Sequence, residues 1–87
     1  KKVFAGKVEY YYPKIKVVQI KGMGKVEFQK GNEFLIIGDK TGIVKDKFTD
    51  ILIDDKKVKK AQQGDVITFK LDQKVREEDD FYLWNNA

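Results

Sequence analysis

Apolar and polar residues alternate along this 87-residue chain with a period of two, which is typical of β-strands and not of helices. We predict strands over residues 8–12, 15–20, 33–38, 43–54, 66–72 and 81–84, and a short strand or turn over the polar stretch 54–65. Residues 33–38 (EFLIIG) are too apolar for a half-exposed strand, which favours a central position in the sheet. Residues 22–32 contain three glycines and are expected to form a loop or an irregular hairpin.

Six or seven short strands, with glycine turns roughly every eight to twelve residues, predict a single all-β domain over residues 1–87. We expect a small closed antiparallel β-barrel, because an open sheet of this size leaves two strand edges exposed. The inward positions expected from the alternation are Val8, Ile15, Val17, Leu35, Ile37, Ile51, Ile53, Val66 or Ile67, Phe69, Leu71 and Leu83.

The residue types that are absent narrow the function. The chain has no His, no Ser and no Cys, which excludes disulfides, thiolate metal sites and the usual activated nucleophiles. We therefore expect no enzyme activity, no cofactor and no metal. A carboxylate enzyme built on Glu9 and Asp65 is a weaker hypothesis, because turn capping explains Asp65 better. The lack of cysteine fits a cytoplasmic protein, and no apolar run approaches the ~20 residues of a membrane span.

Two short motifs are better explained by structure than by ligand binding. GDKTG, residues 38–42, lacks the spacing of a phosphate-binding loop, so we expect a hairpin turn there and no nucleotide. The acidic run 77–80 lacks the interleaved ligands of a calcium loop. We expect a solvated loop, or a counter-charge for the lysines.

Positive charge and tyrosines gather near the N-terminus. Residues 1–30 contain eight lysines and two glutamates, whereas residues 61–87 contain three basic and six acidic residues. Since neighbours on a strand face opposite ways, Tyr10, Tyr11 and Tyr12 cannot all point inward; we place Tyr10 and Tyr12 with Val8, and Tyr11 with Lys7 and Glu9. Exposed rings among lysines suit a nucleic acid, but cross-strand packing accounts for them equally well. Phe81, Tyr82 and Trp84 are expected to close the core.

One stretch resembles a known family. Residues 49–71, TDILIDDKKVKKAQQGDVITFKL, resemble the second domain of translational GTPases such as elongation factor Tu. The matching positions are Ile51, Ile53, Val58, Ala61, Gly64, Asp65, Val66, Phe69 and Leu71. Gly6-Lys7-Val8, Lys30-Gly31-Asn32-Glu33 and Val75-Arg76-Glu77-Glu78-Asp79 resemble the family's other motifs, with Asn32 in place of Asp and Glu78 in place of Gly. The resemblance is closest to stand-alone elongation-factor-like proteins, and the C-terminal barrels of collagenase-like peptidases belong to the same group.

This resemblance implies a β-barrel scaffold whose turns involve Gly6, Gly31, Gly64 and Asp65. It also implies a non-catalytic module that binds tRNA or ribosomal RNA in a translation-related role. On that hypothesis the contacts would come from Lys7, Tyr11, Lys14 and Lys16, with Lys45, Lys47 and Arg76 as outer phosphate contacts. The alternative is an accessory or protein-interaction domain associated with a collagenase-like peptidase, with a protein partner in place of RNA.

Overall fold

The computed structural model describes residues 1–23 and 27–84, which form strands, turns and loops. Residues 24–26 of the predicted loop lie outside the described residues. No helix that could cross a membrane occurs in the described ranges. The strands are β1 (Lys2–Tyr12), β2 (Val17–Gly22), β3 (Phe28–Gln29), β4 (Glu33–Gly38), β5 (Gly42–Lys47), β6 (Ile51–Ile53), β7 (Lys56–Val58), β8 (Lys60–Ala61), β9 (Val66–Lys70) and β10 (Asp80–Trp84).

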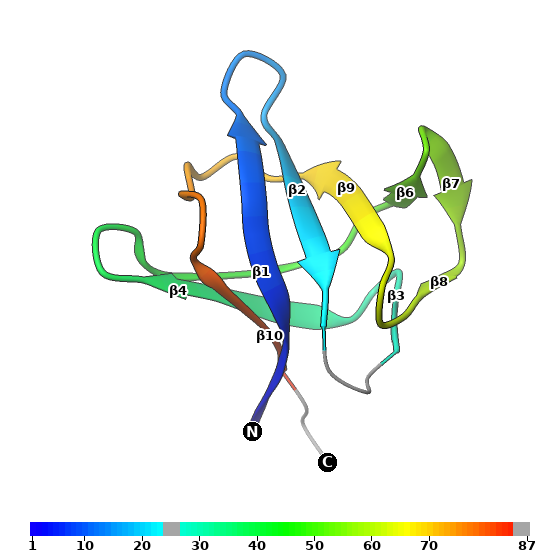
Figure 1. Cartoon of the computed structure of the whole chain (residues 1–87), viewed down its shortest axis with the longest axis horizontal. Helices are drawn as coiled ribbons and strands as arrows, with labels where there is room; N and C mark the ends of the chain where they lie inside the picture. Colours follow the sequence, from blue (N-terminus) through cyan, green and yellow to red (C-terminus); the bar gives the residue numbers. More distant parts are fainter. Residues whose placement is uncertain (24–26, 85–87) are drawn as a thin grey trace.

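Eight of these strands form one antiparallel sheet in the order β5-β4-β10-β1-β2-β9-β6-β7, while β3 and β8 pair separately. The long strand β1 pairs with β10 through its first half and with β2 through its second half, and it crosses the front of the molecule in Figure 1. The all-β prediction is therefore confirmed. The described strands are ten and not six or seven, because two- and three-residue strands such as β6 and β8 are too short to show a period of two.

The sheet curls around a core of aromatic rings. Phe34 on β4 and Phe69 on β9 have three strands between them in the sheet, yet their ring centroids lie 5.0 Å apart. Phe48 packs 4.8 Å from each of these two rings, and Phe81 on β10 lies 5.8 Å from Phe34. Such contacts require the two halves of the sheet to face each other across one shared interior.

The hydrogen-bonded sheet is nevertheless open, so the closed barrel is not confirmed. Within the described residues, β5 and β7 form the two ends of the strand order and do not pair with each other. Both edge strands carry charged residues, which are Lys45, Asp46 and Lys47 on β5 and Lys56 and Lys57 on β7. Lysines on edge strands oppose pairing with another edge, so the sequence itself protects the ends that the fold leaves open.

The predicted core is right in part. Val8, Ile51, Ile67, Phe69 and Leu71 are buried in the core cluster, and Ile53 and Leu83 pack against it. Ile15 is wrong, because it lies in the β1–β2 turn and is 58% exposed. Val66 is exposed and Val17 is half-buried.

The facing of β4 is also the reverse of the prediction. Phe34 and Ile36 join the core cluster, whereas Leu35 and Ile37 point to the opposite side of the sheet. Leu35 is buried on that side, outside the cluster, and Ile37 is half-buried. When both faces of a strand are apolar, alternation alone cannot tell which face is the core.

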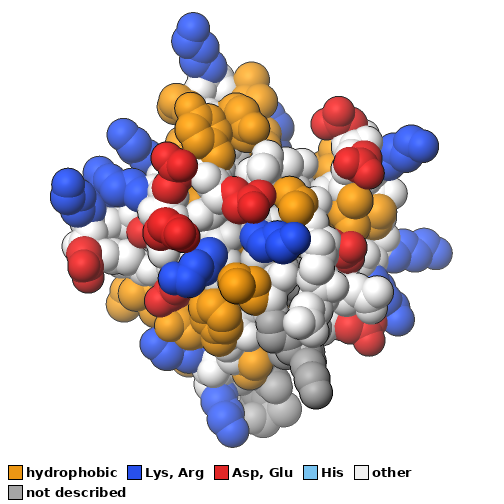
Figure 2. Space-filling model, in the orientation of Figure 1, with side chains coloured by type: hydrophobic (Ala, Val, Ile, Leu, Met, Phe, Trp, Pro, Cys, Tyr) orange, Lys and Arg blue, Asp and Glu red, His pale blue; other side chains and the backbone are white. Residues whose placement is uncertain are grey.

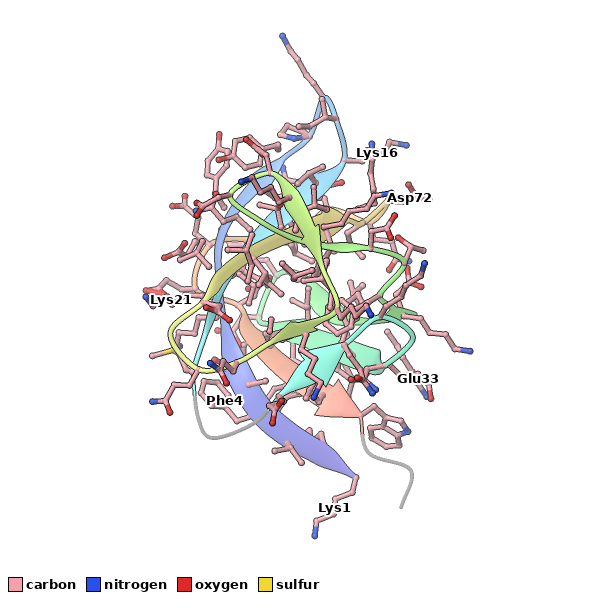
Figure 3. All side chains as sticks on the ribbon, turned by 90° about the vertical axis from the view of Figure 1, so that its right-hand side faces the viewer. Lys1, Phe4, Lys16, Lys21, Glu33 and Asp72 are labelled. Carbon is pink, nitrogen blue, oxygen red and sulfur yellow. The ribbon has the colours of Figure 1, made fainter. Side chains whose placement is uncertain are left out.

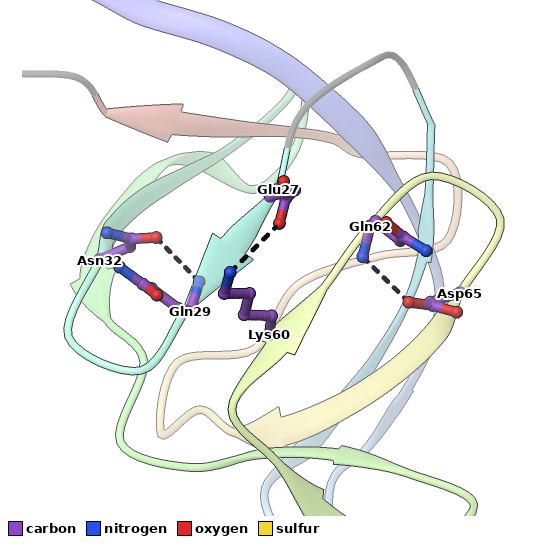
Figure 4. A network of polar contacts seen from close by, with 6 residues as sticks. All are labelled: Glu27, Gln29, Asn32, Lys60, Gln62 and Asp65. Atoms are coloured by element: carbon purple, nitrogen blue, oxygen red, sulfur yellow. Dashed lines mark hydrogen bonds and ion pairs between the residues drawn. The ribbon is translucent and has the colours of Figure 1, made fainter.

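Side-chain caps shape the turns, as Figure 4 shows. Asp65 Oδ2 accepts a hydrogen bond from the Gln62 backbone N–H at 2.9 Å, and Gly64 between them has a φ of 93°. Asn32 Oδ1 accepts a hydrogen bond from the Gln29 backbone N–H at 2.8 Å. Asn32 therefore caps this turn as the aspartate of the resembling family would. Gly6, expected in a turn, lies inside β1 instead. A Cβ there would lie 2.2 Å from the Lys21 carbonyl oxygen, so Gly6 permits β1 and β2 to approach closely.

Candidate interaction surface

Of the residues predicted to bind RNA, Tyr11 is in a position that contradicts its expected role. Tyr11 is 9% exposed and belongs to the core cluster, and its hydroxyl donates to the Leu71 carbonyl at 2.7 Å. Burial, together with the negative charge of Asp72, raises the pKa of this phenol above its ordinary value of 10.0. Tyr11 therefore cannot offer its ring to a base.

A β-bulge explains the reversal. The register between β1 and β2 shifts between Val8 and Tyr10, so Glu9 has no partner on β2. One extra residue moves every following side chain to the other face of the sheet. Val8 and Tyr11 thus both point inward, and Tyr10 and Tyr12 point to solvent with ring centroids 4.7 Å apart.

The lysines expected beside the tyrosines lie at the tip of the β1–β2 hairpin. Lys14 and Lys16 are exposed turn residues, and Figure 3 places Lys16 with Asp72 at one end of the molecule, away from Lys1 and Phe4 at the other. The rings below the tip are held by a polar chain, in which Tyr12 Oη donates to Gln19 and Gln19 Nε2 donates to Glu9 at 2.9 Å. Cross-strand packing thus accounts for part of this exposed aromatic surface.

Two grooves flank β1 beyond this tip. One, of about 310 Å³, is lined by Tyr10, Pro13, Lys74, Arg76 and Glu77 among others. The other, of about 430 Å³, has Lys7 and Lys21 in its lining but also Glu9, Glu77 and Glu78. Each groove mixes both signs of charge, which suits a polyanion poorly.

The remaining predicted contacts lie on other parts of the molecule. Arg76 is in the loop before β10, where its guanidinium donates to Thr41 Oγ1 at 3.4 Å. Lys7, Lys45 and Lys47 share the side of the sheet that faces away from the core. The structure thus divides the seven predicted residues among the hairpin tip, the core, the loop before β10 and this outward side.

That outward side is a surface which the sequence analysis missed, and we call it the outer face. It comprises three rows of side chains that run across β1, β10, β4 and β5 through the strand register. The rows are Lys2, Trp84, Glu33 and Lys47; then Phe4, Tyr82, Leu35 and Lys45; then Lys7, Asp80, Ile37 and Ile43. Figure 2 shows apolar side chains between charged ones over the lower halves of β1 and β10.

Charged groups border this apolar surface. Lys7 Nζ lies 3.1 Å from Asp80 Oδ1, and this hydrogen bond raises the pKa of Lys7 above its ordinary value. Lys45 lies 3.9 Å from Glu33 and also over the Trp84 ring, 4.8 Å from its centroid. The signal for this surface was present in the sequence. Residues 34–37 and 81–84 are apolar at consecutive positions, so each of the two strands has apolar side chains on both of its faces.

The buried carboxylate of Asp79 serves the fold. Its Oδ2 accepts from the Arg76 N–H at 2.9 Å and from the Thr41 hydroxyl, which fastens the loop before β10 to the β4–β5 turn. Glu78, which stands where the resembling family has glycine, has a left-handed φ of 71°. Of the two acids in the enzyme hypothesis, Glu9 bonds Gln19 and Asp65 caps Gln62. Among the described residues no three His, Cys, Asp or Glu side chains gather as metal ligands.

Comparison with known proteins favours one of the two predicted relationships. No family model matches the chain. The chain is 34% identical over 83 residues to an uncharacterized protease of Methanocaldococcus jannaschii, covering 95% of this chain and 20% of that protein. It therefore spans about a fifth of the length of this curated relative.

Solved structures show the same fold. The C-terminal domain of a putative U32 peptidase from Geobacillus thermoleovorans superposes with a TM-score of 0.86 at 19% identity, over 94% of this chain and 92% of that one. Its selenomethionine variant gives a TM-score of 0.83 at 18% identity, over 91% and 96% of the two chains. The resemblance to stand-alone elongation-factor-like proteins gains no support here. The chain is similar in sequence to one stretch of a protease and similar in fold to the C-terminal domain of a putative U32 peptidase.

Proposed function

We propose that this chain is a non-catalytic accessory domain of a U32 peptidase-type protein, which packs beside the peptidase region and contributes to its stability or substrate handling. The observation that carries the proposal is the similarity of 95% of the chain to one stretch of a protease about five times as long. The shared fold with a peptidase C-terminal domain supports the same assignment.

The side-chain chemistry is consistent with a supporting role. Among the described residues Asp79 has the buried carboxylate, and its Oδ2 accepts hydrogen bonds from the Arg76 backbone N–H and the Thr41 hydroxyl. A general acid or base needs a carboxyl group within reach of a substrate. A domain of this kind acts through its surface, by binding and positioning, and leaves bond cleavage to another part of the protein.

A chimera tests this proposal. The M. jannaschii relative is prepared intact, without the matching stretch, and with this chain in place of that stretch. Each form is assayed on a peptide that the intact relative hydrolyses, and this chain is assayed alone. We expect the deletion to lose activity by more than about tenfold and the chimera to recover most of it. A deletion as active as the intact protein, or hydrolysis by this chain alone, would contradict the proposal.

The RNA-binding hypothesis remains a prediction, and the structure suggests how to separate it from the accessory role. The hairpin tip carries Lys14 and Lys16 beside the exposed Tyr10 and Tyr12. If this tip binds RNA, the double variant Lys14→Ala, Lys16→Ala should weaken the binding of bulk tRNA at low salt and reduce the salt slope by about two units. A variant that binds tRNA as the original chain does would end the hypothesis.

A further inference from the structure

The outer face is more apolar than the solvent-facing side of a small β-sheet usually is. Strands that face solvent on one side normally alternate polar and apolar residues. Here Phe4, Tyr82, Trp84, Ile37 and Ile43 all point outward, with Phe4 39% exposed and Ile43 71% exposed. An apolar surface that spans four adjacent strands, rimmed by charge, is typical of a surface that another protein covers.

Lysines shape the edges of this surface. Lys2 lies over the Tyr82 ring at 4.5 Å from its centroid, and Lys45 lies over Trp84 at 4.8 Å. Lys2, Lys7 and Lys47 stand at three corners of the rows, and Ile43 stands at the fourth. The face thus has four lysines against the carboxylates of Glu33 and Asp80. Its complement is an apolar area bordered by carboxylates, and the neutral centre argues against a polyanion such as RNA.

The start of β1 and the end of β10 lie side by side at the outer face. Lys2 at the start of β1 pairs with Trp84 at the end of β10, and both belong to the first row of the outer face. In the M. jannaschii relative, about four-fifths of the protein lies outside the matching stretch and is therefore joined to at least one end of it. A polypeptide joined before β1 or after β10 therefore starts beside the outer face. A tethered partner acts at an effective concentration of about millimolar, so a surface of modest size is sufficient.

We propose that the outer face is the surface on which the domain packs against the peptidase region of the same protein, and that this region presents an apolar area with a rim of Asp and Glu. The inference rests on the proposed function. Ile43, at the β5 corner of the face, is the anchor because it is the most exposed apolar side chain there, and the lysines of the face select the acidic rim.

Two exposed isoleucines provide a matched test. Ile43→Lys places a charge in the outer face, whereas Ile15→Lys makes the same change at the hairpin tip. Each variant is first shown by thermal melting to fold. It is then titrated by calorimetry into the M. jannaschii relative prepared without its matching stretch. We expect Ile43→Lys to weaken binding more than about tenfold, and Ile15→Lys to bind as the original chain does.

The outcomes separate this inference from the proposed function. Equal binding by both variants, or no binding by the original chain at the roughly millimolar concentration that a tether supplies, overturns the inference. The proposed function still stands if the chimera is active. A chimera as inactive as the deletion removes the proposed function itself. If the isolated chain forms a dimer that Ile43→Lys dissociates, the outer face binds a second copy and the inference is wrong. Displacement of the domain by tRNA, with loss of tRNA binding in Ile43→Lys, would also overturn it.

Discussion

At the scale of single residues, the clearest difference between prediction and structure is at Tyr11, which alternation places outward and the fold buries. Alternation correctly predicted that some of the three tyrosines reach the surface, but it assigned them to the wrong sides. An unpaired Glu9 reverses the facing of the residues that follow, and a bulge leaves no mark in the pattern of residue types. The turn residues were easier to predict, since Asp65 and Asn32 cap the backbone through local bonds three residues apart.

The buried phenol of Tyr11 gives a pH dependence of known sign. Because its pKa is raised in the folded state, the unfolded chain loses this proton first as the pH rises above 10. The stabilisation by the neutral hydroxyl, about 1 kcal/mol for its bond to Leu71, is thus complete below pH 10 and declines above it. Urea unfolding free energies of the original chain and Tyr11→Phe should differ at pH 8, and the difference should narrow as the pH rises above 10. A gap that stays constant or widens over this range would show that the hydroxyl is not held as described.

Glu78 has the left-handed backbone that glycine adopts without cost, with a φ of 71°. We expect Glu78→Gly to stabilise the fold by a net of about 0.5–1 kcal/mol, because relief of strain exceeds the greater freedom of the unfolded chain. Glu77→Gly is the matched control and should destabilise by a similar amount. Both values come from urea midpoints at neutral pH. Loss of stability in Glu78→Gly would show that the glutamate side chain contributes more than its backbone costs.

At the scale of elements, two register shifts determine how β1 pairs with its neighbours. The strand contains a second register shift, between Phe4 and Gly6, so it has two bulges and can pair with β10 and β2 in turn. Strand positions could be predicted from the sequence because they follow from alternation and glycine turns. The core side of β4 and β10 could not, since both strands are apolar on two faces and their register depends on partners far along the chain.

Gly6 tests the packing of β1 on β2. A methyl group there would meet the Lys21 carbonyl, so we expect Gly6→Ala to cost about 2–3 kcal/mol of unfolding free energy. Gly31→Ala is the control, because nothing lies within 4 Å of its Cβ and the cost is limited to about 1 kcal/mol for its left-handed φ. Equal effects in thermal or urea unfolding would mean that the two strands separate readily at this point.

At the scale of the whole molecule, the curled sheet turns one side inward around the phenylalanine rings and the other outward. The sequence predicted a small all-β domain and part of that inward side, but it did not predict that the sheet stays open between β5 and β7. Nor did it predict the outer face, because Tyr82 and Trp84 were assigned to the core by their apolar character alone. Only the register across four strands reveals that these rings share a surface with Phe4 and Ile43.

The central claim is that the outer face packs against a peptidase region, and Trp84 reports on it directly because the chain has a single tryptophan. The chain is labelled with 5-fluorotryptophan and observed by fluorine NMR during titration with the unlabelled M. jannaschii relative that lacks its matching stretch. We predict that the Trp84 resonance shifts and broadens as complex forms, equally in Ile15→Lys but not in Ile43→Lys. A resonance that stays unchanged at saturating partner would contradict the account.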